Sequence, residues 1–194
     1  MSLISRVINI VIAPKSEWQA IDSESATVGG LYLGYAIPLS AISALARFIG
    51  IWLIGVRTPL AGLHQLPLTS ALLESIASFI LGLIGIYLVS LIINGFASAF
   101  AGQRNPMQAL KVAVYAATPA WLGGIFHLLP SLGILALLAS LYCLYVLYRG
   151  LPILMKAPKD KAMSYTIAVV VCVFVVTLVI GLVVTKLGGF GNAA

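Results

Sequence analysis

Five apolar stretches, each close to or above the length that crosses a lipid bilayer, constrain this chain more than any other feature. They are residues 29–55, 71–101, 107–129, 131–149 and 164–186. About 20 helical residues cross roughly 30 Å of hydrocarbon, where the backbone must satisfy its own hydrogen bonds. The sequence therefore predicts an all-α membrane protein, a five-transmembrane-helix bundle.

Composition supports this class. Hydrophobic residues make up 61% of the 194 residues and charged residues 8%, so a soluble fold could not bury its apolar side chains. The net charge of +6 comes from basic residues strung between the apolar stretches, not from a patch with interleaved aromatics. We therefore expect membrane lipids as partners, with the chain itself or other membrane proteins as further candidates, and no nucleic acid.

Basic residues outside the spans predict the orientation. Two lie on one side, Arg57 and Lys186, and eight on the other. The eight are Arg6, Lys15, Arg104, Lys111, Arg149, Lys156, Lys159 and Lys161. Because basic loops stay inside, the N-terminus is expected in the cytoplasm and the C-terminus on the outer side. We expect a cytoplasmic segment over 1–28, the five-helix domain over 29–187 and a short outer tail over 188–194.

Residues 2–12 place Leu3, Val7 and Ile10 at helical spacing, which predicts a short amphipathic helix lying on the membrane. Pro14 should end that helix, and a polar segment follows in which Trp18 is expected to anchor at the headgroups. The alternative is a loose terminal tail.

The third span carries the clearest local signals. Asn105 is a good N-cap and Pro106 suits the first helical position. Pro119 cannot donate to the carbonyl of Tyr115, so we expect a bend and an unpaired acceptor inside the bilayer.

A polar stripe on the second span contains Asn94, at a depth comparable with Tyr115 and Thr118. The sequence predicts that Asn94 or a neighbouring hydroxyl approaches the turn at Pro119, because lipid offers no water to satisfy its free carbonyl. Helix packing is one interpretation of this seam, and a ligand pocket is the other.

Arg47 and Glu74 are the charges expected within the bilayer, where each needs a partner. A long arginine could reach Glu74 from the neighbouring span. A structural ion pair is one interpretation, and an ion or proton path is the other.

The sequence offers no constellation for catalysis. Five acids, of which one is expected in a span, cannot form an acid/base pair, and no phosphate loop or nucleophile elbow occurs. His64 and His127 lack clustered ligands, so we expect no metal and no cofactor. Six basic residues are instead candidates for headgroup contact. They are Arg104, Lys111, Arg149, Lys156, Lys159 and Lys161.

Three runs carry a family resemblance: PKSEW at 14–18, GQRNPMQALKVAVYAATPAWL at 102–122 and YRGLPILMKAPKDKAMSY at 148–165. In their order and spacing the chain resembles the bacterial branch of the Yip1 family. The resemblance implies five membrane helices with a cytoplasmic N-terminus. Eukaryotic relatives contact small GTPases, but this chain has a far shorter N-terminal region and lacks their acidic Asp-Leu-Tyr-Gly-Pro type element, so that role does not carry over.

Two functional hypotheses follow. The first is a bacterial inner-membrane protein that organises the membrane or binds lipids or proteins, without catalysis. The second is a small ion or solute permeation protein that uses the polar groups within the bundle. A water-wide polar cavity linking Arg47 with the Asn94 and Tyr115 region would favour the second.

Overall fold

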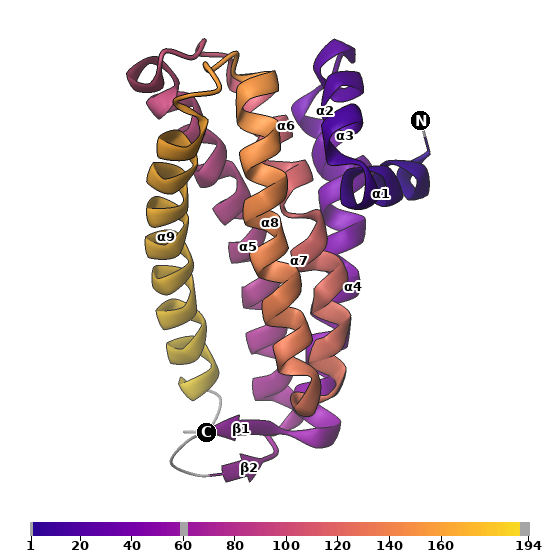
Figure 1. Cartoon of the computed structure of the whole chain (residues 1–194). Helices are drawn as coiled ribbons and strands as arrows, with labels where there is room; N and C mark the ends of the chain where they lie inside the picture. Colours follow the sequence, from indigo (N-terminus) through magenta and orange to yellow (C-terminus); the bar gives the residue numbers. More distant parts are fainter. Residues whose placement is uncertain (1, 59–61, 191–194) are drawn as a thin grey trace.

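The computed structural model describes residues 2–58 and 62–190. Within them the chain forms five helical spans that stand side by side, with a short N-terminal helical segment at one end and a β-hairpin at the other (Figure 1). The spans are Val28–Ile54, Leu68–Phe100, Pro106–Leu128, Gly133–Leu154 and Ala162–Lys186. The predicted all-α bundle of five transmembrane helices is confirmed.

The first span is built from α3 (Val28–Leu31) and α4 (Ile37–Ile49), joined by a wider π-helical turn at Tyr32–Ala36. Pro38 follows that turn, and its missing N–H removes a regular helical hydrogen bond, which accounts for the local widening. A second π turn, Gly50–Ile54, ends the span.

An antiparallel hairpin connects the first two spans. Its strands are β1 (Val56–Thr58) and β2 (Gly62–His64), with Val56 opposite His64. The second span then runs as α5 (Leu68–Phe96) and a 3₁₀ turn, Ala97–Phe100.

The third span is the centre of the bundle. It consists of α6 (Pro106–Ala116), α7 (Thr118–Gly123) and a 3₁₀ turn, Gly124–Leu128. The Asn105 side chain accepts hydrogen bonds from the N–H groups of Met107 and Gln108, both at 3.1 Å, so the predicted cap is confirmed. The helix breaks at Ala117, directly before the Thr118-Pro119 pair, where the bend is predicted. In the most apolar 18 residues of this span, 67% of the residues are buried within the bundle, whereas in the fifth span the corresponding share is 11%.

A 3₁₀ turn at Pro130–Leu132 leads into α8 (Gly133–Leu154), and α9 (Ala162–Phe190) forms the fifth span. α9 packs mainly against α5 and less against α8. Of the expected tail over 188–194, residues up to Phe190 continue α9, and 191–194 lie outside the described residues.

The N-terminal segment holds two helices, α1 (Leu3–Ile12) and α2 (Pro14–Ser23). The expected headgroup anchor is wrong, because Trp18 is fully buried and its Nε1 donates to the carbonyl of Val146 in α8 at 3.0 Å. Gly150 provides the space, since a Cβ there would lie 2.7 Å from the Trp18 ring. The segment is thus docked on the bundle, and the loose-tail alternative is wrong too.

Candidate functional site

The N-terminal segment buries the charge of Arg6, one of the basic residues that the sequence places outside the spans. Arg6 of α1 is buried, and its Nη1 donates to the Glu17 carboxylate of α2 at 2.5 Å. Its Nη2 donates to Glu24, just after α2, and the guanidinium lies 5.6 Å from the centroid of the Tyr115 ring in α6. Two carboxylates and an aromatic face therefore compensate the desolvated cation.

This arrangement shifts two pKa values outside the spans. Burial by itself lowers the pKa of Arg6, but the Glu24 hydrogen bond and the negative charges of Glu17 and Glu24 outweigh it and raise that pKa overall. The hydrogen bond from Arg6 lowers the pKa of the Glu24 carboxyl, against a smaller opposing effect of burial. Both groups are therefore charged at neutral pH.

Lys111 does not contact headgroups as the sequence predicts. It is buried, and its Nζ donates to the carbonyls of Ile21 at 2.9 Å and Glu24 at 2.5 Å. The last carbonyls of a helix lack intrahelical donors and attract positive charge, so this ammonium caps the C-terminal end of α2. Lys111 has these carbonyl partners only because α2 packs beside the start of α6, and no sequence pattern predicts that contact.

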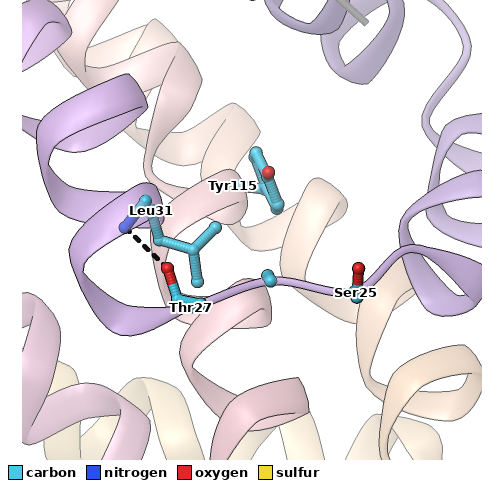
Figure 2. Close-up of a pocket in the computed structure, with 6 residues that line it drawn as sticks. Ser25, Thr27, Leu31 and Tyr115 are labelled. Carbon is cyan, nitrogen blue, oxygen red and sulfur yellow. Dashed lines mark hydrogen bonds between the residues drawn. The ribbon is translucent and has the colours of Figure 1, made fainter.

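Two adjoining cavities lie between the linker over residues 24–27, the start of the first span and Tyr115 of α6, and Figure 2 shows the larger one. The larger, of about 360 Å³, is lined by Ser25, Ala26, Thr27, Gly30, Leu31 and Tyr115. The smaller, of about 180 Å³, is lined by Ser2, Leu3, Arg6, Glu24, Gly30, Gly34, Tyr35 and Tyr115. Gly30 and Tyr115 line both, so we treat the two as one site, called here the Tyr115 pocket.

The hydroxyl of Tyr115 is the notable polar group of this pocket. Its ring is buried, packing edge-on against Tyr35 with centroids 4.7 Å apart and against Trp18 at 6.3 Å. Among the described residues that hydroxyl has no hydrogen-bond partner. The pocket therefore offers a free donor and acceptor beside the Arg6 cluster.

The turn at Pro119 is satisfied, though not by Asn94. Thr118 Oγ1 donates to the carbonyl of Tyr115 at 2.8 Å, and because that proton is used, the Tyr35 hydroxyl must donate to Thr118 Oγ1 at 2.9 Å. The side-chain oxygen of Asn94 is buried without a hydrogen-bond partner in the described part of the chain. A hydroxyl one turn along the same helix reaches the free carbonyl at less conformational cost than an amide on another helix.

Arg47 and Glu74 meet, as their need for partners predicts. Nη2 of Arg47 donates to the Glu74 carboxylate, joining α4 to α5, and Arg47 Nε is buried without a partner among the described residues. Arg47 also lines a cavity of about 200 Å³, called the Arg47 cavity. Its lining residues are Ser40, Ser43, Ala44, Arg47, Ser78, Phe79, Gly82, Ala120, Trp121, Gly124 and His127.

The Arg47 cavity and the Tyr115 pocket share no lining residue. Tyr35, which lines the Tyr115 pocket, hydrogen-bonds Thr118, and along the first and third spans this pair lies between Tyr115 and the Arg47 cavity. These two cavities therefore do not form the continuous path from Arg47 to Tyr115 that would favour permeation. No cluster of potential metal ligands occurs within 2–58 and 62–190.

The remaining headgroup candidates lie at the end of the bundle that carries α1 and α2. Arg104, Lys159 and Lys161 are exposed, and the Arg149 guanidinium lies 5.9 Å from the Tyr145 ring centroid. Lys156 is half exposed and pairs with Asp22.

Comparison with known families adds the evolutionary relationship. The family model of the Yip1 domain matches residues 8–180 of this chain. The chain belongs to the Yip1 family. It is 26% identical to the inner membrane protein YohC of Escherichia coli strain K12, over 97% of this chain and 98% of that protein, and the YohC protein of strain CFT073 gives the same values. No solved structure matches at a significant level.

The Yip1 domain begins within α1 and ends within α9, so it includes nearly all the polar groups described above. Glu17, Lys111, Tyr115 and the Arg47–Glu74 pair lie inside it, and Arg6 lies two residues before its first matched position. These features make the chain a multi-pass membrane protein of the Yip1 family.

Proposed function

We propose that this protein lies in a bacterial inner membrane, with its N-terminus in the cytoplasm, and organises that membrane by binding lipids through its N-terminal segment, without catalysis. The outer face of α1 carries the proposal. Ile4, Ile8 and Ile12 recur every fourth residue and are 69%, 48% and 77% exposed. An apolar stripe on a helix that lies across the spans at their end (Figure 1) suits the boundary between headgroups and acyl chains.

The inner face of the same helix supports this role. Arg6, Val7 and Ile10 are buried against the bundle, so α1 is held with its isoleucines outward. The Tyr115 pocket lies beside α1, since Leu3 and Arg6 line part of it. There the hydroxyls of Tyr115, Ser25 and Thr27 can donate hydrogen bonds to phosphate or ester oxygens of a lipid.

Spin labels test the position of α1. Single cysteines replace Ile4, Ile8 or Ile12 in a chain whose Cys143 and Cys172 have been changed to alanine, and the partly exposed Asn9, about 100° around the helix from Ile8, serves as the matched control. In bilayer nanodiscs we expect labels at the three isoleucine positions to collide with oxygen more than with a water-soluble nickel chelate, and the label at Asn9 to show the reverse. Equal access of all four labels to the chelate would contradict the proposal.

Crosslinking tests what α1 touches. A photoreactive residue at Ile8, activated in native membranes, should capture phospholipid in preference to protein. Capture of one protein partner instead would replace lipid contact with a protein-binding role. Orientation is tested separately, because Ser2→Cys and Lys186→Cys should react with an impermeant reagent from opposite sides of the membrane, with Ser2→Cys reacting from the cytoplasmic side.

Permeation is a second candidate, because two separate cavities lie along the same pair of spans. Tyr35, which lines the Tyr115 pocket, hydrogen-bonds Thr118, and along the first and third spans this pair lies between Tyr115 and the Arg47 cavity. If this is a closed path, proteoliposomes should release small ions or solutes faster with Tyr35→Ala than with the unaltered chain. Unchanged release, with folding intact, would leave lipid binding as the sole candidate.

A further inference from the structure

An apolar groove lies between α8 and α9. Its volume is about 500 Å³, and its lining is almost wholly apolar. Leu144, Tyr145 and Tyr148 line it from α8, and Met163, Ile167 and Val171 from α9. It exists because α9 packs mainly on α5, so α8 and α9 form only a loose pair.

The membrane itself determines what occupies this groove. Both walls belong to spanning helices, and most of the lining residues are exposed at the surface of the bundle. Hydrocarbon therefore surrounds the groove, and an acyl chain is its natural occupant. Because lipid tails are as apolar as the walls, burial alone selects no particular lipid. Selectivity must come from the polar end.

That polar end is basic. The α8–α9 loop joins the two helices at the end of the groove where Met163 lies, and it carries the exposed Lys159 and Lys161. Arg149 lies beside one wall of the groove, since its guanidinium is 5.9 Å from the centroid of the lining Tyr145 ring. Lys156 is already paired with Asp22, and Asp160 is the one acid between the two free lysines. The site therefore keeps an excess of positive charge beside an apolar slot, which is complementary to a phosphate followed by an acyl chain.

We propose that the groove between α8 and α9 binds an anionic glycerophospholipid. The acyl chain lies along Tyr145, Ile167 and Val171, and the phosphate is held by Arg149 with Lys159 and Lys161. The planar guanidinium supplies two parallel donors to the phosphate oxygens, and the lysines supply mobile charge. This site rests on the proposed lipid-binding function, names the lipid class, and uses none of the residues of α1 or of the Tyr115 pocket.

Photocrosslinking in vesicles of known composition tests the site. A benzoylphenylalanine placed at Ile167 is activated in equal mixtures of phosphatidylglycerol and phosphatidylcholine, and mass spectrometry identifies the attached lipid. We expect phosphatidylglycerol to be captured about fivefold or more over phosphatidylcholine, a ratio that high salt lowers. The same residue placed at the lipid-facing Ile80 of α5 is the positional control and should show no such preference.

Charge variants show whether the basic end is responsible. The triple variant R149Q/K159Q/K161Q should bring the capture ratio at Ile167 close to one, whereas K15Q/R104Q, at the same end but away from the groove, should preserve it. The single variant R149Q covers the case in which the triple variant does not fold, and should lower the capture ratio by part of that amount, whereas R149K, which keeps the charge, should lower it less. A ratio of one in the unaltered chain, an equal loss in K15Q/R104Q, or capture of a second copy of this chain in place of lipid would overturn the site.

The two lipid proposals fail in different ways. If the spin labels on α1 face water while phosphatidylglycerol is still preferred at Ile167, the function proposed for the N-terminal segment falls and the groove stands. If α1 lies in the interface but capture at Ile167 shows no preference, only the groove falls.

Discussion

Arg6 and Arg47 both lie in apolar surroundings, yet their partners differ. The Arg6 side chain is 6% exposed and meets Glu17, Glu24 and the Tyr115 ring. The Arg47 side chain is 36% exposed and meets one carboxylate, that of Glu74, and its Nε faces no partner in the described part of the chain.

The difference separates a structural cluster from a candidate site. Around Arg6 two carboxylates and an aromatic ring compensate the charge, which fixes the N-terminal segment onto the bundle and sets the outward face of α1. Arg47 has one carboxylate partner, keeps a donor without a partner in the described part of the chain and lines a cavity, so it can still bind a ligand or water. A buried charge left without its partner costs far more than a half-exposed one, and the expected effects of substitution follow that order.

Glu17→Gln should show the largest effect. It leaves the buried Arg6 with one carboxylate, and breaking such a pair destabilises by about 3 kcal/mol. Glu24→Gln is the matched control, since the Glu24 side chain is 45% exposed and should matter less. Unfolding in mixed detergent and SDS micelles measures both, and equal losses would show that Arg6 is not the closed cluster described here.

Thr118→Val should come next. It removes the donor to the Tyr115 carbonyl and the acceptor of the Tyr35 hydroxyl, and an unsatisfied buried polar group costs about 1–3 kcal/mol. Asn94→Ala, on the helix that the sequence favours for this role, should cost about 0.6 kcal/mol or less. The same micelle titration compares them, and a larger loss for Asn94→Ala would restore the seam that the sequence predicts.

The Arg47–Glu74 pair should contribute less to stability than the contacts of Glu17 or of Thr118. Glu74→Gln should lower stability, and the double change with Arg47→Gln should recover part of the loss, giving a coupling of about 1 kcal/mol. A double-mutant cycle in bilayers measures it. Strict additivity would show that the two charges do not interact, and coupling as large as that at Arg6 would remove the contrast between the clusters.

Acid should weaken the Arg6 cluster by the smallest amount. Because the folded state lowers the pKa of Glu24, its contribution is present above the ordinary glutamate pKa of about 4.3 and is lost as the pH falls through the lower folded value. Arg6, whose pKa is raised, stays charged throughout this range. Melting temperature measured between about pH 6 and pH 3 should fall less steeply in Glu24→Gln. Parallel curves would contradict the assignment.

The sequence by itself determined the features whose causes are local or periodic. Span-length apolar stretches allow only helices in lipid, Asn105 and Pro106 start the third span, and Pro119 breaks it at Ala117. The meeting of Arg47 with Glu74 belongs here too, because a charge within a bundle needs a partner and few were available.

Only the tertiary structure decided which face of α1 meets the bundle and what becomes of Arg6, Trp18 and Lys111. The sequence counts Arg6 among the basic residues outside the spans and places Trp18 and Lys111 at the headgroups, whereas the fold buries all three. Their partners are carboxylates in and just after α2, a carbonyl of α8 and the carbonyl end of α2. Burial of a charged or polar group is favourable only where such partners converge, and that depends on where the chain returns after Pro14, which no local pattern encodes.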